Sequence, residues 1–267
     1  MLDVDNNPLV TIIITTYNRR NLLPLAIQSV ANQTYKKIEL IVVNDAGDDV
    51  KDIVDKFNVD DRFVYYAYFN KEKNAGLGAA RNTGLEHAHG KYVNFLDDDD
   101  QFYPFHIETL VNYMEKNNCK IAYTDAVCHV IKDNQIVNRV IGYSFDYFAD
   151  MLLYQNITPV LTVMYELDEI TKDIRLDENA RVYEDWLLWL ELTKHYDMHH
   201  IAIPTCMYTF KQDGSTMSSS RNEFTTMLPE IYAKTWDRAK NQVRVAQAMN
   251  QILSQRGLSP MFEISTD

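Results

Sequence analysis

Four consecutive aspartates, Asp97 to Asp100, directly follow a predicted buried strand over residues Tyr92–Leu96. Carboxylates this close together repel one another unless a positive charge lies between them. A loop open to water, with an acidic start to the next helix, would also hold such residues. Four carboxylates at the end of a buried strand favour a divalent cation instead, because Mg²⁺ and Mn²⁺ prefer hard oxygen ligands.

Two known ligand-binding motifs fit this chain only superficially. An EF-hand starting at Asp97 would have Phe102 where the loop needs glycine, and Pro104 would interrupt it. The segment Gly76–Arg81 resembles a dinucleotide-binding fingerprint, but Arg81 replaces the third glycine and the segment follows the third predicted strand. We therefore exclude an EF-hand and a nicotinamide cofactor. Arg81 either neutralises a phosphate or pairs with one of the many carboxylates.

A second acidic pair, Glu184 and Asp185, begins a predicted helix that is rich in tryptophan. Acidic residues in a first turn stabilise the helix dipole, which alone would explain both side chains. The serines lie in no GxSxG motif and the seven histidines in no HExxH motif. The sequence therefore gives no support to serine-hydrolase or zinc chemistry.

Composition limits the function classes further. The chain has 267 residues, 46% of them hydrophobic, and a formal net charge of −12. This acidity argues against a general nucleic-acid or anionic-membrane surface, which needs a basic face. Three separate cysteines indicate neither a disulfide framework nor a zinc knuckle. With no signal-peptide pattern and no run near the ~18 apolar residues that span a bilayer, we expect a cytoplasmic protein, with peripheral membrane contact left open.

Alternating strand and helix patterns position these polar clusters. In the first 105 residues we predict strands at Leu9–Thr15, Glu39–Asn44, Phe63–Phe69 and Tyr92–Leu96, and helices at Leu22–Gln33, Val50–Phe57 and Leu77–Ala88. This order predicts parallel crossovers and a doubly wound sheet. Ligands of such sheets bind outside the carboxyl ends of the strands. The residues Thr15–Asn18, Asp45 and the aspartates should therefore meet at one edge.

The pattern beyond Pro104 is mixed. We predict helices at Phe105–Lys116, Phe145–Tyr154 and Glu184–His195, and strands at Ile121–Val127, Gln135–Val140, Val160–Tyr165, His199–Ile203 and Met207–Lys211. The first two of these strands should form a hairpin. One long helical segment, Asn222–Arg256, follows, with Pro229 near its start. Its small basic excess favours packing or subunit contact over a membrane-surface role.

Five ordered motifs in the first 105 residues resemble those of the family 2 glycosyltransferases. They are Val10–Arg19, Ser29–Gln33, Ile38–Asp45, Asn74–Gly76 with Ala80–Asn82, and Phe95–Asp100. Glu184–Trp186 and Tyr208–Lys211 extend the resemblance more weakly to residue 220. It implies an α/β GT-A fold over residues 1–220, Rossmann-like with a mostly parallel central sheet and flanking helices. Residues 8–105 would bind the nucleotide-sugar, 106–220 the acceptor, and 221–267 would form a C-terminal helical extension through which copies could associate.

The resemblance also implies a role for each motif residue. The nucleotide-sugar-binding candidates are Thr15, Tyr17, Asn18, Asp45, Arg81, Asp97 and Asp98. Thr15 and Tyr17 would hold the base, with a hydrogen bond from the base to Asp45. Asp99 would be the direct metal ligand, and Asp97 would reach the metal or its bound water. Asp185 would be the catalytic base, with Glu184 beside it.

The implied chemistry agrees with these residue types. Breaking the anomeric bond leaves a diphosphate whose growing charge Mn²⁺ or Mg²⁺ would stabilise. A carboxylate would remove the proton of the acceptor hydroxyl as it attacks the opposite face of the sugar, which gives inversion. The sequence therefore predicts a metal-dependent inverting transferase that moves one sugar from a nucleoside-diphosphate sugar, UDP-linked in most relatives, to a hydroxyl of a glycan, glycoprotein or glycolipid.

Departures from the family pattern and two alternatives complete the prediction. Asn44 replaces the first of two usual aspartates, and Lys211-Gln212-Asp213 replaces the usual arginine and histidine, which leaves the third metal contact open. A processive synthase is disfavoured because no QxxRW motif follows Asp185. A sugar nucleotidyltransferase would need a glycine-rich loop where Tyr17–Arg20 stands. A non-catalytic nucleotide-sugar or glycan binder would not need Asp99 and Asp185.

Overall fold

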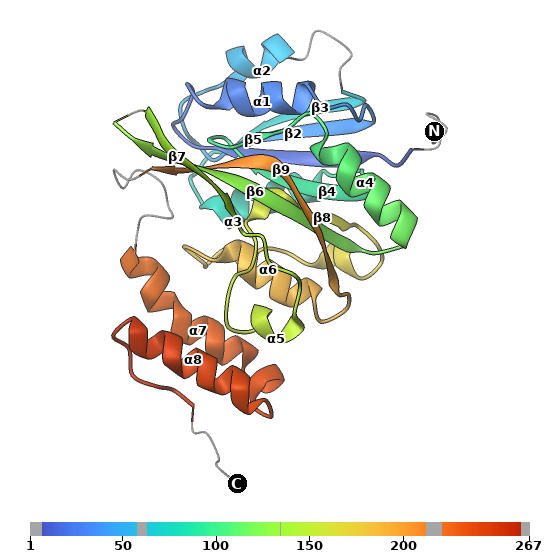
Figure 1. Ribbon diagram of the computed structural model, residues 1–267. Coiled ribbons are helices and arrows are strands. Elements are labelled where there is room, and N and C mark those ends of the chain that lie inside the picture. Colours follow the sequence, from blue (N-terminus) through green and yellow to red (C-terminus); the bar gives the residue numbers. More distant parts are fainter. Residues whose placement is uncertain (1–6, 58–62, 134, 212–220, 263–267) are drawn as a thin grey trace.

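The computed structural model describes residues 7–57, 63–133, 135–211 and 221–262. Its described residues form one sheet in the order β3-β2-β1-β4-β8-β6-β9-β5, with β7 paired to β6 (Figure 1). The strands are β1 Val10–Thr16, β2 Ile38–Asn44, β3 Tyr65–Asn70, β4 Tyr92–Asp97, β5 Gln101–Phe102, β6 Ile121–Lys132, β7 Gln135–Gly142, β8 Val163–Glu166 and β9 Met198–Lys211. This confirms the predicted α/β fold with a mostly parallel central sheet.

The first four strands run parallel, as predicted. β1 pairs with β2 on one side and β4 on the other, and β2 pairs with β3. Every residue of β1 and β2 is buried. Strands covered on both faces are mostly apolar, which explains the runs Ile12–Ile14 and Leu40–Val43 in these two strands.

Helices cover both faces of the sheet and create two cores. Ile12 and Ile14 of β1 face the core under α1 Leu23–Ala31, α2 Lys51–Phe57 and α4 His106–Asn117. Ile13 faces the other core, under α3 Leu77–Glu86, α5 Ala149–Leu152 and α6 Glu184–Leu192. Successive strand side chains point to opposite faces, so one strand contributes to both cores.

The second half differs from prediction in three places. β6 and β7 form the predicted hairpin, but the predicted helix at Phe145–Tyr154 is only α5, and Val160–Thr162 is a 3₁₀ turn that precedes β8. The two strands predicted around Pro204 are a single strand, β9, whose pairing with β6 shifts register near Asp125. Proline has no N–H to donate, so the ladder shifts at Pro204 and then resumes.

The C-terminal segment is a pair of helices, α7 Arg221–Ala239 and α8 Val243–Gln255, so the prediction of one long helix is wrong. The pair lies beside α6, away from the sheet (Figure 1). Pro229 lies inside α7, and the chain turns back at residues 240–242. Ile231, Tyr232 and Met249 all join the core of α6. One continuous helix would leave half of this apolar surface without a partner.

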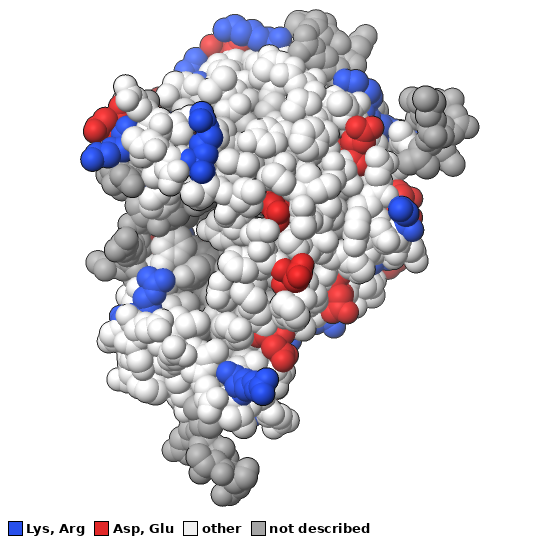
Figure 2. Space-filling model, viewed as in Figure 1, with Lys and Arg blue, Asp and Glu red and all other residues white. Residues whose placement is uncertain are grey.

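The described surface is mixed in charge. In Figure 2, Lys and Arg are scattered singly among Asp, Glu and uncharged residues on the visible face. None of the described helices has the length and apolar content that crossing a membrane requires.

Candidate active site

The carboxyl ends of β1 and β4 meet at one edge of the sheet, as predicted. Thr15 pairs with Asp97 in register, and Thr16 pairs with Asn44 at the end of β2. The Thr16 hydroxyl donates a hydrogen bond to Asp98 Oδ2 at 2.7 Å. Residues that are about 80 positions apart in the sequence therefore share one polar site.

Arg19 supplies a positive charge within the aspartate run. Its Nη1 lies 3.0 Å from Asp98 Oδ1 and 3.0 Å from Asp99 Oδ2. Burial raises the pKa of Asp98 to about 6, and Arg19 and Thr16 counteract that rise. Sequence reasoning placed Thr16 at this edge but assigned no individual role to it or to Arg19, although both lie within the first motif. Their position beside Thr15 and Tyr17 was the signal that could have identified them.

The four aspartates divide into two buried and two partly exposed side chains. Asp98 and Asp100 are each 3% exposed, and Asp100 accepts a hydrogen bond from the Thr209 backbone N–H at 2.8 Å. The side chains of Asp97 and Asp99 remain 28% and 14% exposed. Asp98 and Asp100 therefore fix the loop, while Asp97 and Asp99 keep accessible oxygens.

These oxygens suit a cation that binds together with a diphosphate. Mg²⁺ is usually held by one or two carboxylates and substrate phosphates, not by an all-protein cage. Asp97 and Asp99 offer such a pair, and no group of three or more His, Cys, Asp or Glu side chains is arranged as a complete metal site in the part of the chain described. Gln212 and Asp213, the positions at which the sequence left the third metal contact open, lie outside the described residues.

Arg81 is an ion-pair residue that joins β4 to α6. Its guanidinium is buried, with Nη2 2.7 Å from Asp97 Oδ1 and Nη1 2.6 Å from Glu184 Oε1. Of the two alternatives for this residue, the structure contains the pairing with carboxylates. A buried charge is tolerated when it is paired in this way, and removal of one partner is costly. Arg81 thereby fixes the start of α6 relative to the aspartate loop.

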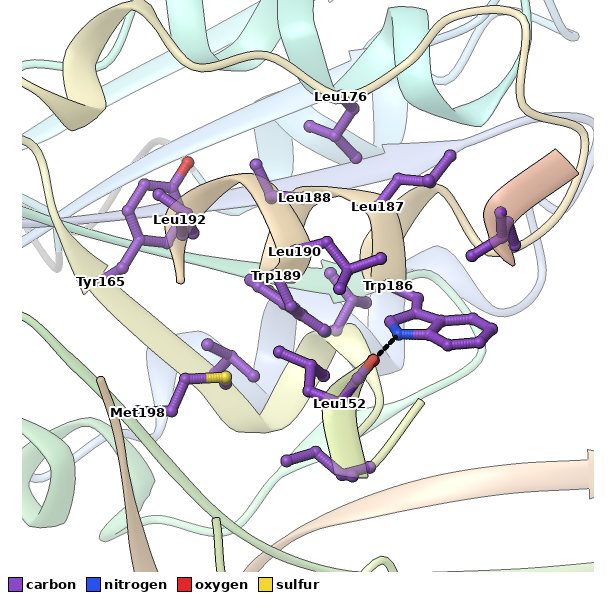
Figure 3. Packing of buried hydrophobic residues seen from close by; sticks show 14 of the residues in the cluster. Leu152, Tyr165, Leu176, Trp186, Leu187, Leu188, Trp189, Leu190, Leu192 and Met198 are labelled. Atoms are coloured by element: carbon purple, nitrogen blue, oxygen red, sulfur yellow. Dashed lines mark hydrogen bonds between the residues drawn. The ribbon is translucent and has the colours of Figure 1, made fainter. Parts of the chain in front are cut away.

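Two buried tryptophans anchor α6 in the core. Trp186 and Trp189 are fully buried, and the Trp186 indole N–H donates to the Leu152 carbonyl at 2.7 Å, the contact drawn as a dashed line in Figure 3. The labelled leucines around them point into the same core (Figure 3). Because these side chains are fixed, the position of the acidic first turn of α6 is fixed as well.

Asp185 has the most unusual environment among the candidate residues. Asn156 Nδ2 lies 3.2 Å from both carboxylate oxygens, and the Trp186 backbone N–H donates to Oδ1 at 2.7 Å. Burial, and then the charge of Glu184, raise the pKa of Asp185 to about 7. A carboxylate that titrates near neutral pH is suited to accept a proton during a reaction. Asn156 lies in no motif, so local sequence gave no signal for it.

Asp45 organises the neighbouring loop. Its carboxylate accepts hydrogen bonds from the backbone N–H groups of Ala75 at 3.1 Å and Gly76 at 2.8 Å. It also lies 3.4 Å from Lys71 Nζ. Asp45 thus links the end of β2 to the start of α3, and its predicted contact with a base stays a prediction.

The segment after β1 presents a ring at the same edge. Tyr17 is 48% exposed, and Asn18 has a left-handed backbone with φ 54°. The Asn18 side chain accepts a hydrogen bond from the Asp48 backbone N–H at 2.8 Å. Gly47 is required beside it, because a Cβ there would lie 2.6 Å from Asn18 N. Thr15 is 5% exposed, so Tyr17 is the accessible residue of this pair.

A cavity of about 1270 Å³ extends from Asp97 and the first turn of α6 to the C-terminal helices. Asp97, Arg81, Glu184 and Asp185 line one part of it. The remainder of its wall includes the α7 and α8 side chains Phe224, Leu228, Tyr232, Ile252, Gln255 and Arg256. Pockets for one small ligand occupy roughly 300–1,000 Å³, so this cavity has room for two substrates at once.

Comparison with known sequences gives one consistent result. The family model "Glycosyl transferase family 2" matches residues 11–165. A putative teichuronic acid biosynthesis glycosyltransferase of Bacillus subtilis is 29% identical over 80% of this chain and 83% of its own length. A Campylobacter jejuni protein named GalNAc(5)-diNAcBac-PP-undecaprenol beta-1,3-glucosyltransferase is 29% identical over 83% of this chain and 71% of its own.

Solved structures share the fold at low sequence identity. Staphylococcus aureus TarS 1-349 in complex with UDP-GlcNAc has a TM-score of 0.69 and 18% identity, over 93% of this chain and 72% of that one. A mannosyltransferase of Pyrobaculum calidifontis in complex with GDP-Man and Mn²⁺ has a TM-score of 0.68 and 16% identity, over 96% and 74%. The sheet order and the helices on both faces are therefore those of the GT-A transferases.

Proposed function

Because the chain belongs to glycosyl transferase family 2, and is therefore a glycosyltransferase, we propose that it is a metal-dependent inverting enzyme. It transfers one sugar from a nucleoside-diphosphate sugar, UDP-linked, to a hydroxyl of a glycan. The observation that carries this proposal is the pair of carboxylates joined through Arg81: Asp97 at the donor edge, and Glu184 next to Asp185. The groups for the leaving diphosphate and for the attacking hydroxyl thus line one cavity.

The donor lies at the carboxyl ends of β1, β2 and β4. Tyr17 offers an exposed ring for the base, and Asp97 and Asp99 hold Mn²⁺ or Mg²⁺ together with the diphosphate. When bound, the cation stabilises negative charge on the departing diphosphate. The UDP-GlcNAc complex and the Mn²⁺ complex of two proteins with this fold support the donor class and the use of a cation.

Asp185 is the base for the acceptor hydroxyl. Glu184 is already paired with Arg81, whereas the hydrogen bonds that Asp185 accepts from the described residues come from neutral donors, Asn156 and the Trp186 backbone N–H. These donors orient the carboxylate before the hydroxyl arrives. Asp185 takes the proton as the oxygen attacks the anomeric carbon on the face opposite the diphosphate, and the configuration inverts.

The acceptor is a glycan, free or lipid-linked. The printed name of the Campylobacter relative, with its diphosphate-undecaprenol acceptor, supports this class. The acceptor lies toward α7 and α8, because Asp97, Glu184 and Asp185 line the other part of the cavity.

A donor-hydrolysis assay tests the proposed function. Purified protein is incubated with a panel of UDP- and GDP-sugars, with EDTA, Mg²⁺ or Mn²⁺, and the released nucleotide is measured. We expect metal-dependent release that falls at least a hundredfold in Asp99→Asn and Asp185→Asn. The matched control is Asp237→Asn on α7, whose carboxylate is 92% exposed and does not line the cavity. Release that survives EDTA contradicts the metal role, and saturable donor binding without release by any variant indicates a non-catalytic binder.

A further inference from the structure

The cavity has two ends of different chemistry. The donor end contains Asp97, Asp100, Glu184 and Asp185, with Arg81 paired to Asp97 and Glu184, and Lys211 also lines the cavity. The other end contains the cation Arg256 with Gln255 beside it, and otherwise aromatic and aliphatic side chains: Tyr154, Val182, Tyr183, Phe224, Leu228, Tyr232 and Ile252. An acceptor that fits this end presents apolar surface to the rings and a complementary charge to Arg256.

Arg256 differs from the other arginines of the site, because it has no carboxylate partner among the residues that the structure describes. Arg19 and Arg81 each contact two carboxylates. No carboxylate within the described ranges lies at ion-pair distance from Arg256, and its side chain is exposed at the cavity wall. It caps the C-terminus of α8. The helix dipole explains why a cation lies at the C-terminus of α8, but it does not explain why Arg256 also lines the cavity.

Tyr183 connects this end of the cavity to the base. It directly precedes Glu184 and has a left-handed backbone, φ 64° and ψ 18°, which is strained for a tyrosine. Its ring packs edge-on against Trp186 at 5.2 Å and Phe224 of α7 at 4.8 Å. The charges of Arg256 and of Asp185 both act on the Tyr183 hydroxyl. Arg256, Tyr183 and Asp185 line the same cavity, so a molecule bound there can contact Arg256 while its hydroxyl reaches Asp185.

We propose that α7 and α8 complete the acceptor site, and that Arg256 binds an oxyanion of the acceptor, a phosphate or a carboxylate. A sugar next to that oxyanion packs against the ring of Tyr183. This inference rests on the proposed function and adds the class of acceptor. A guanidinium binds phosphate and carboxylate oxygens through two parallel hydrogen bonds. Because the chain has a net charge of −12, it needs such a local positive charge to attract an anionic substrate.

The test measures binding of three small probes to the full chain saturated with UDP and Mn²⁺, which occupy the donor end. The probes are glucose 1-phosphate, the methyl glycoside of glucuronic acid, and neutral methyl glucoside, each titrated by NMR. In Arg256→Ala we expect at least tenfold weaker binding of an anionic probe and unchanged binding of the neutral one, because a charged hydrogen bond is lost. Arg256→Lys should recover part of the loss. Arg244→Ala is the matched control, since it removes an exposed arginine of α8 that does not line the cavity.

The outcomes separate this inference from the proposed function. A stronger effect on the phosphate probe indicates a phosphate-linked acceptor, and a stronger effect on the carboxylate probe indicates a uronic acid. Equal binding by the wild type and Arg256→Ala, an equal loss in Arg244→Ala, or no anion binding by the wild type would each overturn the Arg256 site. UDP binding is measured first and separately. Failure at that step contradicts the nucleotide-sugar donor, whatever the probes show.

Discussion

The pH dependence of catalysis should report the environment of Asp185. With a pKa of about 7, only about one tenth of this carboxylate is ionised at pH 6, so kcat/KM should rise about tenfold from pH 5 to 6 and level off above pH 7. Asn156 and Glu184 act on this carboxylate in opposite directions. Their removal should therefore move the acidic limb of the profile in opposite directions.

The sizes of these shifts follow from the contacts. A hydrogen bond to a charged group is worth about 1.5–3 kcal/mol, and one pKa unit corresponds to about 1.36 kcal/mol. The two Asn156 contacts are long, 3.2 Å, so Asn156→Ala should raise the pKa of Asp185 by about one unit. Glu184→Gln removes a neighbouring negative charge and releases Arg81 from one partner, and both effects lower the pKa of Asp185.

The assay is donor hydrolysis between pH 5 and 9, in which water takes the place of the acceptor. Asn156→Ala should shift the acidic limb to higher pH, and Glu184→Gln should shift it to lower pH. Asp237→Asn, on the exposed side of α7, should leave it unmoved. If both variants move the limb in the same direction, or neither moves it, Asp185 is not the titrating base.

Three further predictions concern stability. Asp185→Asn should raise Tm at pH 8 but not at pH 4: the raised pKa means that ionising this side chain costs free energy in the folded state, and that cost develops as pH rises toward 7. Arg81→Gln should lower the free energy of unfolding by about 3–5 kcal/mol in urea titrations, because it leaves two carboxylates without their cation. Gly47→Ala should weaken donor binding and lower Tm in thermal melts, since its Cβ would meet Asn18 N at 2.6 Å; an unchanged melt would show that the segment yields easily.

The sequence predicted the parts of the fold that depend on local pattern. The continuous apolar residues of β1 and β2 identified buried parallel strands, and strand ends located the aspartate edge. The sequence-based prediction failed where tertiary contacts determine where a helix ends. The chain turns back after Ala239 because both helices need the same core, and Pro229 stays inside α7. Neither choice is visible in a short window of sequence.

The candidate site also contains residues that sequence motifs identify and residues that only the packing of the fold brings together. Asp97 and Asp185 stand in recognisable motifs, so sequence alone could propose them. Asn156 reaches Asp185 across 29 residues, and Arg81 reaches Glu184 across 103. Such contacts follow from how α6 is anchored by Trp186, which no spacing rule describes. Sequence therefore suggests which groups react, and packing determines which neighbours tune them.

The register shift at Pro204 determines which side chains of β9 face the cavity. Between Thr124 and Ala126 of β6, the partner strand β9 runs from Ile201 to Cys206 and so contains three extra residues. Because side chains alternate between faces, an odd number of extra residues exchanges the faces of all that follows. With the register as it is, Tyr208 and Phe210 line the cavity. Deletion of one residue there would turn both rings away, so a relative could change its acceptor by an insertion or deletion far from any catalytic residue.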